Sequence, residues 1–125
     1  MRRLPDTELE VMKALWASGP DTPRAALERS LAPFGWAANT INTYLARLAE
    51  KGFVTCEKRG RSNWYAPAVS REAYLEFESG AVLSRVFGSS LKNFVASLAR
   101  GGALRDGELD ELQQYLEELK RGDRP

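Results

Sequence analysis

Short polar side chains gather in the segment 39–47, where they alternate with apolar residues at three- and four-residue spacing. In a helix this spacing places the apolar residues on one face and leaves the polar ones on the others. Hydroxyl and amide groups form the hydrogen bonds that read the edges of base pairs, whereas an arginine also suits a phosphate. The side chains expected to contact DNA from this helix are Asn39, Thr40, Asn42, Thr43 and Arg47.

A basic hairpin is expected directly after this helix. Gly52 can end the helix in a left-handed turn, and two segments of strand composition then flank a polar tip that contains Gly60. Three cations, Lys58, Arg59 and Arg61, lie at that tip. Cations at a hairpin tip are usually solvated, but beside a polar helix they favour contact with phosphates, which hold DNA in place without reading its sequence.

The preceding residues must position these groups. Apolar spacing predicts a first helix over residues 8–17, with a capping box that starts at Thr7. A second helix is expected to be capped by Thr22 and to end before Pro33. Three helices followed by a hairpin are the order of a winged helix-turn-helix domain, whose third helix enters the major groove. We therefore expect a mainly α fold with a winged helix-turn-helix DNA-binding domain at residues 1–68.

The segment 69–125 is expected to form a helical dimerisation domain. Ser70 opens a long helical segment, and Asp106 is expected to cap a last helix whose leucines follow alternating three- and four-residue steps. These helices hold more apolar surface than so small a domain covers, and a second copy of the chain would bury it. The residues expected at this homodimer interface are Tyr74, Phe77, Leu83, Phe87, Phe94, Leu98, Leu109, Leu112, Leu116 and Leu119.

Composition limits the chemistry. The 125 residues include no histidine and only one cysteine, Cys56. This composition excludes a disulfide framework, histidine-based catalysis and a thiolate or imidazole metal cluster within one chain. We expect no enzyme activity, no metal and no cofactor. Cys56 is expected to be a small strand residue, with redox sensing as the alternative.

Charge and apolar runs indicate the kind of partner and the compartment. Residues 1–68 carry ten lysines and arginines against seven acidic residues, whereas residues 69–125 carry eight against ten. The positive excess therefore lies in the half with the polar helix. No window approaches 18 consecutive apolar residues, and no apolar run follows the two arginines near the start. We expect a cytoplasmic protein without a signal peptide or a membrane span.

Three blocks of the sequence occur together: LPDTELEVMKALW, TINTYLARLAEKGFV and KRGRSNWYAPAVSREAYLEFES. In this combination the chain resembles the penicillinase-repressor family of bacterial winged-helix regulators, the BlaI/MecI/CopY type, over roughly residues 4 to 120. The resemblance implies a dimeric repressor that binds double-stranded DNA at a palindromic operator and leaves it when a signal arrives.

The resemblance also implies roles for single residues. Thr40, Thr43 and Arg47 fall where the family contacts DNA, whereas Asn39 and Asn42 stand at places often occupied by lysine. Asparagine can pair bidentately with adenine but does not neutralise a phosphate, so we expect operator sequence and salt dependence to differ from those of better-known members.

Two interpretations are open for Asn93 and Phe94. The resemblance implies that a membrane-bound sensor protease relieves repression by cutting an Asn-Phe bond in the C-terminal domain, and this dipeptide stands at a similar place. Alternatively, Phe94 is a core residue and Asn93 an exposed helix position. Copper-responsive members carry clustered C-terminal cysteines, which this chain lacks.

Two classes of function agree with the sequence. The first is a homodimeric transcriptional repressor in which Thr40, Asn42 and Thr43 read bases. In this repressor, phosphates are held by Arg47, Lys58, Arg59 and Arg61. The second is a winged-helix module that works through protein contacts without specific DNA binding, an alternative that the modest net charge of +1 keeps open. DNA binding that weakens steeply as salt rises distinguishes the first class from the second.

Overall fold

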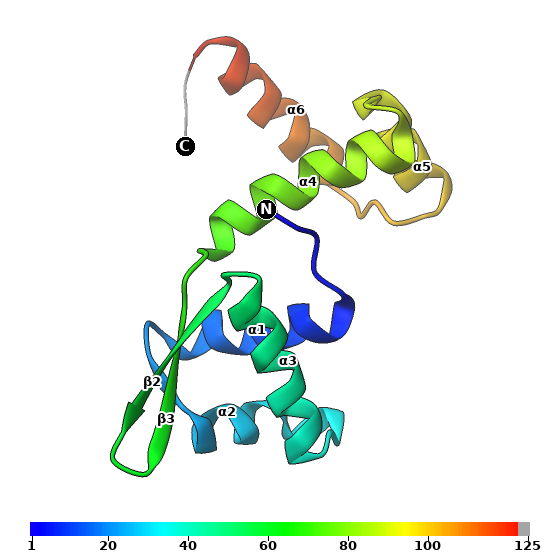
Figure 1. The fold of residues 1–125 in the computed structure, drawn as a ribbon. Coiled ribbons are helices and arrows are strands. Elements are labelled where there is room, and N and C mark those ends of the chain that lie inside the picture. Colours follow the sequence, from blue (N-terminus) through cyan, green and yellow to red (C-terminus); the bar gives the residue numbers. More distant parts are fainter. Residues whose placement is uncertain (123–125) are drawn as a thin grey trace. The chain divides into compact units, whose positions relative to one another are not determined.

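The computed structural model describes residues 1–122, and the chain divides into two compact units, Met1–Ser79 and Gly80–Pro125. The division falls inside one long helix, α4 (Arg71–Phe87) (Figure 1). The first unit begins with α1 (Asp6–Ser18), β1 (Thr22–Pro23), α2 (Arg24–Leu31), the 3-10 turn η1 (Ala32–Phe34), α3 (Ala38–Glu50), β2 (Val54–Arg59) and β3 (Ser62–Pro67). The second unit contains α5 (Leu91–Arg100) and α6 (Glu108–Lys120). This order confirms the predicted winged helix-turn-helix architecture.

The three strands form an antiparallel sheet in the order β1-β3-β2. Arg59 pairs with Ser62, so a two-residue loop closes the hairpin that forms the wing (Figure 1). Gly60 begins this loop with a φ of 62°, the positive value that such hairpin turns require at their first position. The predicted hairpin with a cationic tip is therefore confirmed.

The short strand β1 corrects the expected start of the second helix. Thr22 pairs with Tyr65 of β3 and is buried, so α2 begins only at Arg24, with Pro23 as its N-cap. The structure therefore uses Thr22 in the sheet and not as the capping hydroxyl that the sequence suggested. Pairing with the wing fixes where α2 starts.

A single apolar core holds the helices and the wing of the first unit together. Its buried members come from α1, α2, α3, α4, the wing and the segments just before α1 and β2: Leu4, Val11, Met12, Leu15, Leu27, Leu31, Ile41, Leu45, Leu48, Phe53, Val54, Tyr65 and Tyr74. Burial of each such side chain contributes on the order of 2 kcal/mol to folding.

Tyr74 belongs to this core, although the sequence suggested a place at the dimer interface. Its side chain is fully buried, and its hydroxyl accepts a hydrogen bond from the backbone N–H of Leu4 at 2.8 Å. Phe77 packs against the same core and is half-buried. A ring with no exposed surface has none to offer a second chain, which removes Tyr74 from the expected dimer contacts.

The start of α1 also differs from the expectation. The helix begins at Asp6 with Pro5 as its N-cap and no side-chain cap, so the predicted capping box at Thr7 is wrong. Glu8 is buried in the first turn, where Lys51 Nζ lies 2.5 Å from its carboxylate. Because Lys51 directly follows α3, this ion pair joins the start of α1 to the end of α3.

The second unit is held together far less tightly. No residue from 80 to 122 is buried. The rings of Phe87 and Phe94 pack edge to face, with centroids 4.9 Å apart. Ser90 caps α5 by accepting a hydrogen bond from the Asn93 N–H at 3.1 Å. Helix α6 has Gly107 as its N-cap, so the predicted cap at Asp106 is wrong.

Across residues 1–122, none of the helices is both long and apolar enough to span a lipid bilayer.

Candidate nucleic-acid interface

Helix α3 places its apolar and polar residues on separate faces. Ile41, Leu45 and Leu48 are buried in the core. The residues expected to contact DNA lie on the remaining surface, where four are exposed and Thr40 is half-buried. They are Asn39, Thr40, Asn42, Thr43 and Arg47. The outer face of α3 is therefore built from hydroxyl, amide and guanidinium groups.

Thr43 is restricted in the hydrogen bonds that it can offer. Its hydroxyl donates to the carbonyl oxygen of Asn39, one turn earlier, at 3.0 Å. This back-bond uses the only proton of the hydroxyl group. The oxygen remains an acceptor, so Thr43 suits the amino group of adenine or cytosine and, through its methyl group, the methyl group of thymine.

Arg24 contacts Asn42, one of the residues expected to bind DNA, and the sequence reasoning missed it. From the first position of α2, its Nη2 donates to Asn42 Oδ1 at 2.7 Å, and its Nε donates to the same oxygen at 3.3 Å. Nη2 also donates to the carbonyl oxygen of Ala38 at 3.2 Å, and Nη1 lies 2.7 Å from Glu28 Oε1. Eighteen positions separate Arg24 from Asn42, so no local spacing in the sequence signals their contact.

The cations of the wing differ in their surroundings. Lys58 and Arg61 are exposed at the tip. Arg59 Nη2 lies 2.6 Å from an Asp21 carboxylate oxygen and 3.2 Å from one of Glu57. The hydrogen bond with Arg59 lowers the pKa of Glu57 below its ordinary value. Arg59 is therefore already occupied by two carboxylates, whereas its neighbours at the tip project into solvent.

The aromatic residues of the wing are used in packing. The guanidinium of Arg59 lies 4.7 Å from the ring centroid of Trp64, which is a cation–π contact. Tyr65 is buried, and this burial raises the pKa of its hydroxyl. Neighbouring strand residues face opposite ways. Trp64 and Tyr65 are thus used within the wing, and the exposed Cys56 lies opposite Tyr65 on β2.

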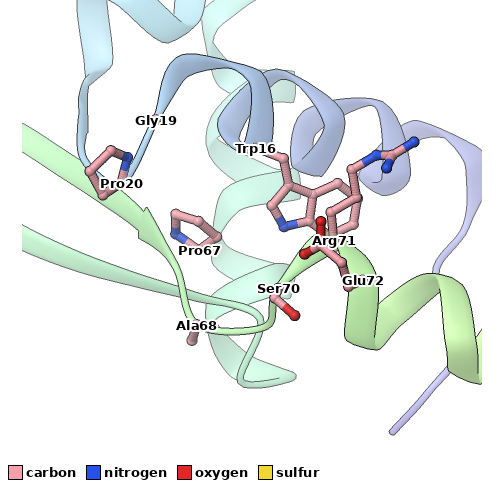
Figure 2. A pocket seen from close by; sticks show the side chains of 8 residues that line it. All are labelled: Trp16, Gly19, Pro20, Pro67, Ala68, Ser70, Arg71 and Glu72. Carbon is pink, nitrogen blue, oxygen red and sulfur yellow. The ribbon is translucent and has the colours of Figure 1, made fainter. Parts of the chain in front are cut away.

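The base of the wing is tied to α1. The Trp16 indole N–H donates to the Val69 carbonyl oxygen at 2.9 Å. Figure 2 shows this indole beside a surface hollow of about 520 Å³, with Pro20 and Pro67 on one side and the start of α4 on the other. None of the residues expected to contact DNA lines the hollow. The hydrogen bond therefore joins α1 to the segment that directly follows the wing.

The apolar residues of the second unit are largely exposed. Leu109, Leu112, Leu116 and Leu119 of α6 are exposed, each by more than a third of its surface. An apolar groove of about 480 Å³ is lined by Leu91, Lys92, Val95, Ala96, Leu112 and Leu116 of α5 and α6. The other expected dimer residues are half-buried: Leu83, Phe87, Phe94 and Leu98.

Among residues 1–122, no three histidine, cysteine, aspartate or glutamate side chains are grouped so as to hold a metal ion.

Residues 4–118 match the family described as penicillinase repressor. The chain is 32% identical over 123 residues to the penicillinase repressor of Bacillus licheniformis, and the alignment covers 96% of both chains. It is 24% identical to the methicillin resistance regulatory protein MecI of Mammaliicoccus sciuri, covering 87% of this chain and 89% of MecI.

Two solved structures each resemble more than half of the chain. The DNA-binding domain of the repressor BlaI matches with a TM-score of 0.51 and 32% identity, covering 59% of this chain and 94% of that domain. Bacillus licheniformis BlaI, in monomeric form in complex with the blaP half-operator, matches with a TM-score of 0.50 and 32% identity, covering 58% and 89%. The chain belongs to the penicillinase repressor family.

Proposed function

We propose that the chain is a DNA-binding transcriptional repressor that acts on an operator. The observation that carries the proposal is the outer face of α3, which presents hydroxyl and amide groups next to a wing whose tip is cationic. Similarity to BlaI, which was solved with a half-operator, supports double-stranded DNA as the partner. Membership of a repressor family argues against an enzyme.

The two elements divide the work of binding. The polar residues of α3 read base edges in the major groove, as the recognition helix of a helix-turn-helix protein does. Arg47, Lys58 and Arg61 hold phosphates, because they are exposed cations beside or beyond that helix. Arg59 contributes less to phosphate contact than its neighbours, since Asp21 and Glu57 already neutralise it.

Titration with duplex DNA tests this function. The operator is found by selecting from a library of duplexes randomised over about 30 base pairs, which accommodates two half-sites about 10 base pairs apart. The affinity for selected duplexes should fall steeply between two salt concentrations. A protein-interaction module without specific DNA binding would enrich no sequence, and that result would reject the proposal.

We also propose that the second unit forms a homodimer through α5 and α6. Its lack of buried residues and its apolar groove support this, because a second copy would remove the exposed leucines from water. Sedimentation velocity should show a dimer for the parent chain and a monomer for Leu112→Glu with Leu116→Glu. Gln114→Glu adds a charge on the opposite face of α6 and should leave the dimer intact.

Relief of repression by a membrane-bound sensor protease at Asn93–Phe94 is the proposed inactivation route. Exposure of Asn93 supports it, whereas Phe94, in the first turn of α5, is half-buried against Phe87 at the end of α4. Proteases bind their substrates in extended form, so cutting here requires the first turn of α5 to unwind. Mass spectrometry of the chain from induced cells should give fragments ending at Asn93, and an intact chain during induction would reject this route.

A further inference from the structure

Asn42 cannot use both ends of its amide group while Arg24 remains in place. A guanidinium group only donates hydrogen bonds, so the atom of Asn42 that faces it is the oxygen, and the NH2 group is the end that points away. The oxygen has two acceptor positions. Nη2 and Nε of Arg24 both donate to it, at 2.7 and 3.3 Å, so the guanidinium already engages this oxygen.

Arg24 itself is firmly held. Its side chain is only 17% exposed, and its Nη1 lies 2.7 Å from the Glu28 carboxylate one turn further along α2. Its Nη2 reaches the Ala38 carbonyl oxygen in the first turn of α3. The guanidinium therefore joins the start of α2 to the start of α3 and fixes the direction of the Asn42 amide.

We propose that Arg24 sets the base preference of Asn42 by making it a reader that only donates hydrogen bonds. Asparagine pairs bidentately with adenine by accepting from N6 and donating to N7. With its oxygen occupied, Asn42 keeps only its NH2 donors, and these suit the two acceptors of guanine, N7 and O6. Arg24 is thus a positioning residue for sequence recognition. This inference rests on the proposed DNA-binding function.

The test is sequence selection by the full chain from the duplex library, with the parent and an Arg24→Met variant. The parent should select guanine at the base pair that Asn42 contacts, which is the position where Asn42→Ala loses preference. Arg24→Met frees the oxygen and should raise the ratio of adenine to guanine there by roughly 5- to 160-fold, the range of one bidentate base contact. Arg29→Met removes the same charge from α2 and should leave the ratio unchanged.

A double variant separates positioning from direct contact. In the Asn42→Ala background, Arg24→Met should change no base preference, because the amide that it positions is gone. A shift that persists in this background would show that Arg24 touches the DNA itself and would overturn the inference. An unchanged ratio in folded Arg24→Met would overturn it as well.

Arg24→Lys covers the case in which Arg24→Met does not fold, as judged by thermal unfolding. Lysine keeps the charge but lacks the planar fork, so it should give a smaller shift in the same direction, and no shift would overturn the inference. Selection of no sequence by the parent would overturn the proposed function and this inference together. A selective parent with an unresponsive Arg24 would overturn the inference alone.

Discussion

Removing the two exposed cations of the wing tip should reduce the salt dependence of DNA binding by a calculable amount. Lys58 and Arg61 project into solvent, so each is free to contact one phosphate. Each phosphate contact contributes about 0.9 to the slope of log affinity against log salt. The variant Lys58→Ala with Arg61→Ala should therefore lose roughly 1.8 from this slope per protomer.

This difference between the two slopes corresponds to a large difference in affinity at high salt. When salt rises fourfold, the parent chain on a single half-site should lose roughly twelvefold more affinity than the double variant. Fluorescence anisotropy with a labelled half-site duplex at several salt concentrations measures both slopes. Each protomer can be assessed alone in this way, before any dimer is considered.

Two further variants make the measurement specific. Lys13→Ala removes an exposed cation of α1 that pairs with Glu10, and it should leave the slope unchanged. Arg59→Ala should lower the affinity but change the slope little, because Arg59 is neutralised by Asp21 and its loss leaves that carboxylate near the DNA. Equal slopes for the parent and the variant lacking Lys58 and Arg61 would refute the assignment of phosphate contacts to the wing tip.

Four predictions concern stability and are checked by urea denaturation. Lys51→Met should lower the free energy of unfolding by roughly 3 kcal/mol, because the buried Glu8 carboxylate loses its partner; a loss under 1 kcal/mol would contradict this. Ala37→Ser should raise it by about 1 kcal/mol, since Ala37 is the N-cap of α3 in extended conformation without a side-chain cap. Burial raises the pKa of Tyr74, so stability should be full below the unfolded tyrosine value of about 10 and fall as pH rises further. Tyr74→Phe should weaken this alkaline loss and cost about 1–2 kcal/mol at neutral pH, because the Leu4 N–H is left without its acceptor.

The helices and the wing could be predicted because their signals are local. Ile41, Leu45 and Leu48 lie on one face of a helix whatever surrounds them, and the apolar stripe of α3 was therefore recognised correctly. The wing follows equally from local chemistry, since Gly60 supplies the positive φ that its loop requires. The polar face of α3 was predicted as the complement of its buried one.

The predictions from the sequence fail where residues far apart in the chain determine the local structure. Thr22 has the composition of a helix cap, but pairing with Tyr65 of β3 takes it into the sheet. Tyr74 looks like part of an apolar stripe, yet its hydroxyl reaches Leu4, 70 positions earlier in the chain. The bond between Arg24 and Asn42 is of the same kind, because it requires the packing of α2 beside α3. The spacing of residues along the chain does not predict such long-range contacts.

The charge of Arg59 shows a second limit of prediction from the sequence. In the sequence it is one of three equivalent cations at the wing tip, and only its contacts with Asp21 and Glu57 distinguish it from the others. A count of charges in the wing therefore overestimates how many are free to bind phosphate.

The proposed role of α3 is tested most directly by mapping the surface of the isotope-labelled chain that contacts DNA. Backbone amide resonances are followed by NMR while a selected half-site duplex is added to the full chain. If α3 and the wing bind the duplex, the shifts should be concentrated in residues 38–47 of α3 and residues 58–62 of the wing tip, with little change in the second unit. Shifts confined to α1 or to the second unit, with α3 unaffected, would contradict the claim that α3 reads the operator.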